Sequence, residues 1–169
     1  MKANPDAPQL AVRRRALADG KRVYMAVPRL ANPKPFIRLG HDATIKARDG
    51  RSVAAEELGH VDLIVCGTVA VNRAGVRVGK GGGYSDLEFA LLVEEALVDA
   101  DTTIVTTVHP LQILDEDLPE TEHDFRVDLI VTPDEVIEAG RRRRPPGLVW
   151  DHLDDAKIAE IPVLAARRA

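Results

Sequence analysis

The segment from Gly75 to Asp86 holds residues whose types and spacing suit the binding of an anion. Four of the five residues from 79 to 83 are glycine, and a helix-starting pattern follows them directly. Glycine takes positive φ easily and leaves backbone N–H groups open to a ligand. A helix N-terminus adds unpaired N–H donors and partial positive charge, and Arg77 and Lys80 add two full charges. The segment therefore predicts a binding site for a chain of phosphates.

Spacing excludes two familiar phosphate loops. A Walker A loop requires Ser or Thr after its Gly-Lys pair, whereas Gly81 follows Lys80. The dinucleotide fingerprint G-x-G-x-x-G would need glycine where this chain has Tyr84. A structural alternative stays open, in which the glycines only turn a flexible hairpin and the basic side chains are solvated. Arg77, Lys80 and the capping pattern Ser85–Glu88 together favour the phosphate site.

The elements that position this loop follow from four short apolar runs rich in β-branched residues. These runs lack strict in-and-out alternation, which indicates strands of a parallel sheet covered on both faces; they are Arg22–Val27, Val61–Cys66, Thr103–Val108 and Val127–Val131. Helices are predicted between them, at Gln9–Ala18, Val53–Leu58, Asp86–Ala100 and Pro133–Ala139. Such alternation predicts an α/β fold with an open three-layer, mainly parallel sheet, formed by residues 1–169 as one domain.

Two capping boxes mark predicted helix starts, Thr132-Pro-Asp-Glu135 and Ser85–Glu88, the second with Tyr84 and Phe89 as a hydrophobic staple. The segment Gly140–Gly147 carries four arginines and two prolines, which predicts a loop. A short strand near Leu148–Trp150 and a final helix or tail are expected after it.

Composition limits the class of protein. The 169 residues are 45% hydrophobic, enough for one substantial core, and 23 basic residues among 27 acidic ones give no field that points to nucleic acid or an anionic membrane. The single cysteine, Cys66, excludes a disulfide framework and a thiolate zinc site and is expected to be a buried apolar residue. Without an apolar stretch of about 20 residues or a secretory signal, we expect a cytoplasmic protein with no membrane partner.

The glycine segment also resembles a known motif. Arg77–Asp86 is similar to the ATP-binding motif of the 5-formyltetrahydrofolate cyclo-ligase family, or methenyltetrahydrofolate synthetases, which runs approximately R-x-G-x-G-x-G-Y-Y-D-R. Three further segments resemble the family in the same order, so that the resemblance covers about Gly20 to Val136; they are Gly20–Pro28, Val61–Gly67 and Leu118–Pro133. The loop is closest to a divergent branch that reads G-K-G-x-G-Y-x-D-L-E-F-A.

The resemblance implies a fold shared with ribose-5-phosphate isomerases and CoA transferases, and it implies ATP and Mg²⁺ as cofactors. In that family the γ-phosphoryl group moves to the formyl oxygen on N5 of 5-formyltetrahydrofolate. N10 then attacks, and loss of phosphate closes 5,10-methenyltetrahydrofolate. Phosphoryl transfer of this kind depends on positioning and charge neutralisation. The expected partner is therefore a small-molecule folate.

Carried over by position, the resemblance places seven residues around the phosphates, namely Arg77, Gly79, Lys80, Gly81, Gly82, Gly83 and Tyr84. Arg77 and Lys80 take the catalytic roles. Asp86 and Asp124 would hold Mg²⁺, which prefers oxygen ligands. Each aspartate also has a structural alternative. Asp86 would complement the helix dipole, and Asp124 would be a turn residue before a strand.

Several positions depart from the family's pattern. Ser85 stands where the motif has a second tyrosine, and Leu87 where it often has arginine. Only 19 residues precede Gly20, too few for the family's basic N-terminal helix, and the arginines at 13–15 do not match it. We therefore expect a chain truncated relative to the family, with weak or no turnover. The alternatives are a noncatalytic nucleotide-binding module of the same fold and an RNA-associated protein that uses Arg141, Arg142, Arg143 and Arg144.

Other polar residues leave alternatives open. His109 and Gln112 follow a predicted strand, where open parallel sheets bind ligands, so they could face the pocket or be hydrogen-bonded locally. His123 adjoins Asp124, but no third ligand at zinc-like spacing is visible. Trp150 is expected to be a packing residue. The arginine run without an adjacent aromatic platform is typical of a solvated loop, or it could lie above the phosphate pocket.

Overall fold

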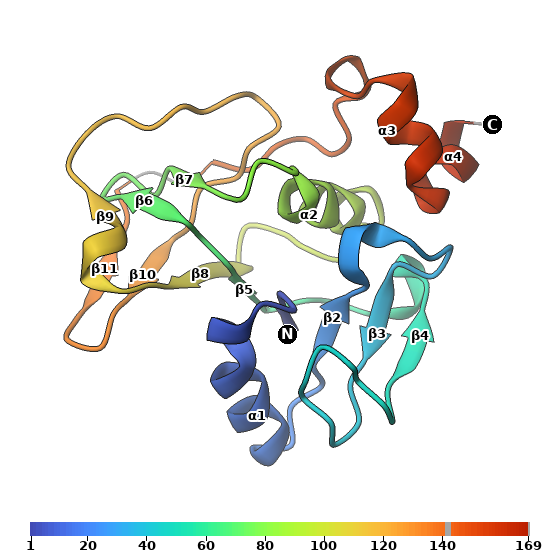
Figure 1. Cartoon of the computed structure of the whole chain (residues 1–169), viewed down its shortest axis with the longest axis horizontal. Coiled ribbons are helices and arrows are strands. Elements are labelled where there is room, and N and C mark those ends of the chain that lie inside the picture. Colours follow the sequence, from blue (N-terminus) through green and yellow to red (C-terminus); the bar gives the residue numbers. More distant parts are fainter. Residues whose placement is uncertain (141–142, 169) are drawn as a thin grey trace.

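The computed structural model describes residues 1–140 and 143–168 and contains one large sheet with helices on both faces (Figure 1). The sheet has eight strands in the order β11-β10-β8-β5-β1-β2-β3-β4. Its five central strands are parallel; they are β10 (Leu129–Val131), β8 (Thr103–Thr107), β5 (Leu63–Cys66), β1 (Lys2–Ala3) and β2 (Tyr24–Ala26). The predicted open, mainly parallel α/β fold is confirmed.

Antiparallel strands extend the sheet at both edges. One edge carries β3 (Phe36–Arg38) and β4 (Arg51–Val53), and the other carries β11 (Val136–Glu138). The sequence pattern did not predict β1, a strand in the middle of the sheet. Its two residues pair with Tyr24 of β2 on one side and with Ile64 and Val65 of β5 on the other.

The main helices are α1 (Leu10–Ala18), α2 (Tyr84–Glu94), α3 (Asp155–Glu160) and α4 (Pro162–Arg168). Figure 1 shows α1 on one side of the sheet and α2 on the other. The larger core cluster joins α2, α3 and α4 to β5, β8 and β10. A smaller cluster around Met25 and Ala16 lies beneath α1. The two clusters confirm a three-layer arrangement.

Single turns of 3-10 helix connect several elements; they are Ala7–Gln9, Pro28–Leu30, Ala55–Glu57, Pro110–Gln112 and Trp150–His152. Cys66 lies in the core, and burial raises the pKa of its thiol. In the described part of the chain, no helix is long and apolar enough to cross a membrane.

The helix predicted at Pro133–Ala139 is wrong. Thr132 Oγ1 accepts hydrogen bonds from the backbone N–H groups of Asp134 and Glu135, so the expected cap closes a tight turn. The chain then returns as β11, which pairs antiparallel with β10. The local sequence pattern indicates a helix, but antiparallel pairing with β10 makes this segment an edge strand instead.

Three other predicted elements need correction. The helix at Val53–Leu58 is only the single turn Ala55–Glu57, because β4 extends to Val53. The helix expected to reach Ala100 ends at Glu94, and Ala96 has a positive φ of 52°. The strand expected near Leu148–Trp150 is absent from the described residues, where Trp150–His152 forms a helical turn.

A second, three-stranded sheet carries the glycine segment. It has the order β7-β6-β9, with β6 (Ala70–Asn72) antiparallel to β7 (Arg77–Val78) and parallel to β9 (Ile113–Leu114). The chain leaves β7, forms the glycine loop and enters α2. The prediction that this loop lies at the start of the helix containing Phe89 and Leu92 is therefore confirmed.

Candidate functional site

The loop Gly79–Gly83 joins β7 to the N-terminus of α2. Gly81 and Gly83 have positive φ values of 85° and 65°, a conformation that side chains with a Cβ adopt only at a cost. Gly83 stands immediately before the first helical residue, and no side chain caps the helix there. The first N–H groups of α2 are thus left for another acceptor, which suits an anion.

The capping box predicted at Ser85 is wrong, because the helix already begins at Tyr84. Ser85 Oγ instead accepts a hydrogen bond of 2.7 Å from Asn4 Nδ2. Glu88 forms a buried ion pair with Lys2, and Lys2 also donates to Asn4 Oδ1. These side chains tie α2 to β1 and to the residue that follows it.

Arg77 and Asp86 lie on either side of the glycine loop and form a buried ion pair. Arg77 Nη2 is 2.5 Å from Asp86 Oδ1. The guanidinium also lies 4.0 Å above the ring centroid of Phe125, where the aromatic face attracts a cation. Arg77 Nε is buried and has no hydrogen-bond partner among the described residues. One donor of this arginine is therefore unused.

Asp86 and Asp124 act on each other electrostatically. Burial raises the pKa of the Asp86 carboxyl, Arg77 opposes that rise, and the negative charge of Asp124 adds to it. Asp124 Oδ2 accepts hydrogen bonds from the backbone N–H and the hydroxyl of Thr121, at 2.7 and 2.9 Å. The fold thus brings the two predicted metal ligands into one region.

Lys80 lies on the exposed part of the loop. Its side chain is 80% exposed, and Nζ donates a 2.8 Å hydrogen bond to Asp6 Oδ1, which raises the pKa of the lysine. Asp6 follows β1 at the carboxyl edge of the parallel strands. Arg13 supports this segment by donating to the backbone oxygens of Asn4 and Asp6. The loop cation is thus held by a residue from a distant part of the sequence.

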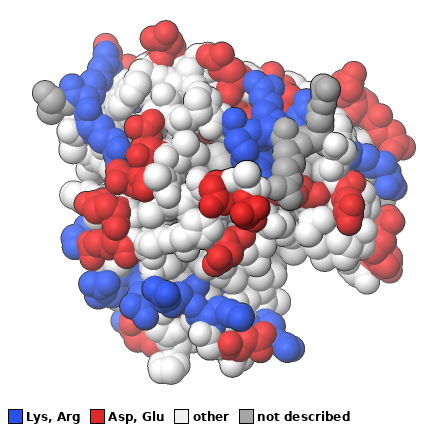
Figure 2. Space-filling model, turned by 180° about the vertical axis from the view of Figure 1, so that it is seen from behind, with Lys and Arg blue, Asp and Glu red and all other residues white. Residues whose placement is uncertain are grey.

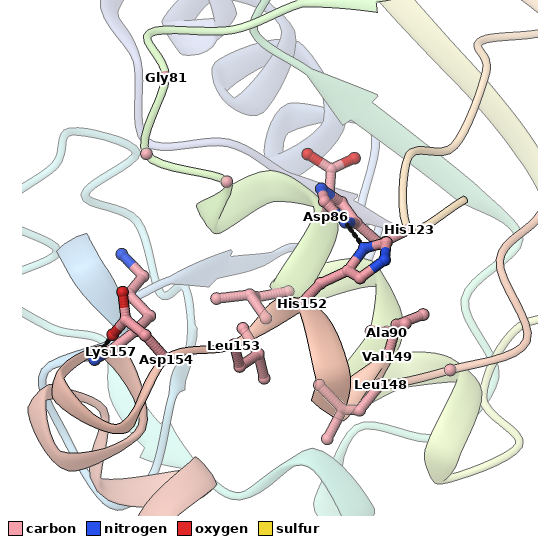
Figure 3. A pocket seen from close by; sticks show the side chains of 14 residues that line it. Gly81, Asp86, Ala90, His123, Leu148, Val149, His152, Leu153, Asp154 and Lys157 are labelled. Carbon is pink, nitrogen blue, oxygen red and sulfur yellow. Dashed lines mark hydrogen bonds between the residues drawn. The ribbon is translucent and has the colours of Figure 1, made fainter. Parts of the chain in front are cut away.

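A cavity of about 300 Å³ opens beside the loop (Figure 3). It lies between the loop, α2 and the C-terminal segment; its lining residues are Gly81, Gly82, Gly83, Asp86, Leu87, Ala90, His123, Gly147, Leu148, Val149, His152, Leu153, Asp154 and Lys157. Four residues of the predicted site are in this lining. Five are not, namely Arg77, Gly79, Lys80, Tyr84 and Asp124.

Tyr84 faces the C-terminal helices. Its hydroxyl donates a 3.3 Å hydrogen bond to Glu160 Oε1, and Lys157 Nζ lies 3.7 Å from the centroid of its ring. The side chain therefore contacts α3 and residues close to it. A place for its hydroxyl beside the phosphates stays a prediction.

Sequence reasoning missed the pairing of His123 with His152. Their Nδ1 atoms are 2.6 Å apart and the rings meet edge to face, as Figure 3 shows. His152 Nε2 is also 3.3 Å from Glu122 Oε1. Two histidines 29 residues apart give no spacing signal, because only the tertiary fold brings the C-terminal segment to this loop.

His109 and Gln112 are hydrogen-bonded locally, which is the second of the two alternatives that the sequence left open. His109 Nδ1 accepts from the N–H of Leu111, and Gln112 Oε1 accepts from the N–H of His109. Gln112 Nε2 donates to the backbone oxygens of Thr68 and Val69. Both side chains therefore stabilise the turn after β8.

Among the described residues, no group of three or more His, Cys, Asp or Glu side chains could hold a metal ion.

Two arginines of the basic run are engaged in structural ion pairs. Arg143 Nη1 lies 3.0 Å from Glu120 Oε2, and Arg144 Nη2 lies 2.6 Å from Asp128 Oδ2. The side chains of Arg143 and Arg144 are therefore held by ion pairs and are not simply solvated. Arg141 and Arg142 lie outside the described residues. On the face shown in Figure 2, basic side chains form a band across the lower part, and both signs are mixed above it.

Comparison with known proteins gives several matches. A model described as the 5-formyltetrahydrofolate cyclo-ligase family matches residues 1–133. The human "Methenyltetrahydrofolate synthase domain-containing protein" is 38% identical over 184 residues, which is 100% of this chain and 48% of the relative. Its mouse counterpart is 38% identical over 180 residues, which is 97% of this chain and 48% of the relative.

A bacterial relative is named for the reaction itself. The "5-formyltetrahydrofolate cyclo-ligase" of Mycolicibacterium smegmatis is 32% identical over 87 residues, 52% of this chain and 41% of the relative. The chain spans about half the length of the human and mouse relatives that it matches.

Proposed function

The chain belongs to the 5-formyltetrahydrofolate cyclo-ligase family, and we propose that it binds Mg-ATP at the glycine loop and acts on 5-formyltetrahydrofolate to give 5,10-methenyltetrahydrofolate. One observation carries the proposal. The loop Gly79–Gly83 takes positive φ at Gly81 and Gly83 and opens a cavity at an N-terminus of α2 that no side chain caps. Such a loop is suited to phosphate oxygens.

The charges around the loop support a polyanionic ligand. Lys80 lies on the loop itself, and its contact with Asp6 is an exposed one that a phosphate can replace. Arg77 lies in the strand just before the loop, where its buried ion pair with Asp86 holds a positive charge beside the loop. In the proposal these two cations neutralise the phosphates, and Gly82 with its neighbours supplies backbone N–H groups.

The acidic residues fit Mg²⁺ together with phosphate. Mg²⁺ is commonly held by one or two carboxylates, with phosphate oxygens and waters completing its octahedral shell. Asp86 lines the cavity, and Asp124 is near enough to influence its protonation. Two carboxylates without a third protein ligand agree with a cation that arrives bound to a nucleotide.

Bound Mg-ATP would supply the phosphoryl group that makes the formyl oxygen a leaving group. The chain's own task is to hold the two reactants and to balance charge, which are the main contributions of a protein to phosphoryl transfer. Arg77, fixed by Asp86 and the ring of Phe125, is pre-organised for that role. The exposed Lys80 can follow the phosphate chain as it binds.

Two measurements test the proposal. Calorimetry with Mg-ATP and with 5-formyltetrahydrofolate measures binding, and the absorbance of methenyltetrahydrofolate follows turnover. We expect both ligands to bind and ATP binding to require Mg²⁺. Binding of ATP without any binding of the folate would favour a noncatalytic nucleotide-binding module. Affinity for RNA that falls steeply with salt, in the absence of ATP binding, would favour an RNA-associated protein instead.

A further inference from the structure

The cavity beside the glycine loop has two walls of different origin (Figure 3). One wall is the loop with the first turns of α2, including Leu87 and Ala90. The other is the segment Gly147–Lys157, which we call the C-terminal wall and which supplies half of the lining residues. The matching family model ends at residue 133. The C-terminal wall therefore lies entirely outside the region that defines the family match.

The C-terminal wall follows α2 from one end to the other. At the C-terminal end of the helix, the N–H of Leu148 donates a 3.1 Å hydrogen bond to Glu94 Oε1. At the N-terminal end, Lys157 Nζ lies over the ring of Tyr84. The wall thus runs antiparallel to α2, with the cavity between them.

Apolar contacts make the C-terminal wall a fixed part of the domain. Leu148, Trp150 and Leu153 pack against the main core cluster. Ile158 and Leu164, in the helices that follow, are buried in the same cluster. Sites built on packed elements hold a ligand more accurately than free loops do.

A polar contact ties the C-terminal wall to the opposite loop. His152 lies in the wall and meets His123, which precedes the strand β10, with 2.6 Å between their Nδ1 atoms. Both histidines line the cavity at this junction. The contact therefore adds the loop before β10 to the α2 and C-terminal sides of the cavity lining.

Apolar side chains from both walls line the cavity. Leu87 and Ala90 of α2 line one side, and Leu148, Val149 and Leu153 line the other. Gly81, Gly82 and Gly83 of the glycine loop also line it. The polar side chains of the lining are Asp86, His123, His152, Asp154 and Lys157. Apolar walls with a few polar groups are typical of small-molecule sites, and about 300 Å³ is at the small end of their range. This arrangement suits a flat apolar ring joined to an anionic group.

We infer that α2 and the C-terminal wall form a slot for the heteroaromatic base of the nucleoside triphosphate whose phosphates lie on the glycine loop. The inference rests on the proposed function, which places phosphates on that loop. The slot and the loop are parts of one continuous cavity. The proposed reaction also brings the folate next to the phosphates, so continuity alone does not assign the slot. A cavity of about 300 Å³, at the small end of the range for ligand sites, fits the base better than the larger folate.

The test fills the slot from each wall. Ala90→Leu and Val149→Phe extend side chains that line the cavity. Ala165→Leu makes the same Ala-to-Leu change at an exposed position of α4 and serves as the control. Each variant and the unchanged chain are titrated with Mg-ATP, with Mg-tripolyphosphate, which has no base, and with 5-formyltetrahydrofolate. Calorimetry measures affinity. Emission of Trp150, the only tryptophan, reports directly on the wall.

We expect both slot variants to weaken Mg-ATP about ten- to a hundredfold, because the ring loses its apolar burial. Tripolyphosphate affinity should stay unchanged, and the control should bind both ligands normally. Circular dichroism checks folding. If Ala90→Leu overpacks the helix and unfolds, Val149→Phe, at a partly exposed position, gives the result by itself.

Three outcomes would overturn the slot. Undiminished Mg-ATP affinity in a folded Val149→Phe variant would exclude the base from it. Weakened folate affinity with normal ATP affinity would assign the slot to the folate ring. If the chain without substitutions binds neither Mg-ATP nor tripolyphosphate, the proposed function is overturned, and the slot with it. The first two outcomes leave the phosphate site on the glycine loop intact.

Discussion

Arg77 and Asp86 form a buried ion pair across the two ends of the glycine loop, with 2.5 Å between Nη2 and Oδ1. Arg77 belongs to β7 and Asp86 to the first turn of α2. The pair therefore fixes the entrance and the exit of a loop that has few side chains of its own. A rigid frame around a glycine-rich segment is what pre-organises backbone donors for a ligand.

Breaking this pair should destabilise the fold. We expect Asp86→Ala to lower the free energy of unfolding by about 3–5 kcal/mol, because it leaves the Arg77 guanidinium buried without its counter-charge. Urea unfolding measures the change. The double variant Arg77→Met with Asp86→Leu serves as control and should recover most of the stability, since an apolar pair removes both charges. Equal stability of Asp86→Ala and the unchanged chain would mean that the pair does not stabilise the frame.

Lys80 is expected to act on the ligand and not on stability. Lys80→Ala should weaken Mg-ATP binding about ten- to a hundredfold, through loss of one charge-assisted contact, and should leave thermal unfolding almost unchanged because the pair with Asp6 is exposed. Lys34→Ala is a matched control, since Lys34 forms an exposed ion pair of the same 2.8 Å with Glu57. Equal ATP affinity in the two variants would remove Lys80 from the site.

The conformation of the loop can be tested at single glycines. Gly81→Ala should cost about 1–2 kcal/mol, because φ is +85° there even though no atom lies near the new Cβ. Gly79→Ala, where the nearest atom is 3.8 Å away and φ is not in the left-handed region, should be close to neutral. Thermal unfolding compares the two variants. If Gly79→Ala were the more damaging change, the loop would have a different conformation.

The loop between β3 and β4 predicts a pH dependence. The hydroxyl and N–H of Thr44 and the N–H of Arg48 donate to Asp42 and lower its pKa from 3.8 to about 2. The ionised carboxylate therefore stabilises the folded state above pH of about 4, and this contribution is lost as the pH falls toward 2. Asp42→Ala should lower the melting temperature at pH 7, and the difference should shrink near pH 2.

The exposed Asp117 gives the control for this experiment, because Asp117→Ala changes the same charge elsewhere on the surface. Melting curves of the three proteins between pH 2 and pH 7 separate the local effect from the effect of net charge. A difference between Asp42→Ala and the unchanged chain that is the same at both ends of the range would contradict the role of the carboxylate.

Much of the sheet could be predicted from the sequence because its strands are covered on both faces. Runs such as Val61–Cys66 and Thr103–Val108 must be apolar on both sides, and that pattern is visible without any tertiary information. β1 gave no such signal. Its Lys2 is charged and is buried only because Glu88, 86 residues away, supplies the counter-charge. A pairing of that kind cannot be read from local composition.

The glycine loop was predictable, whereas the other side of the cavity was not. Loop residues and the following helix are adjacent in sequence, so their local conformation carries the signal. Thr132-Pro-Asp-Glu135 shows the limit of local reasoning, since the same pattern that caps a helix here closes the turn before β11. The contact of His123 with His152 and the position of Val149 depend on how the C-terminal segment packs against α2.

The buried pair of Lys2 with Glu88 also orders events during synthesis on the ribosome. Translation produces β1 before the other strands of this sheet, yet β1 lies between β2 and β5 in the finished sheet. Its lysine has no buried counter-charge until α2 has been made. A nascent chain that ends before residue 88 must keep Lys2 in water, because a lone buried ammonium is too costly. The centre of the sheet therefore forms late. More than half of the 169 residues must be synthesised before the strands can fold cooperatively around β1.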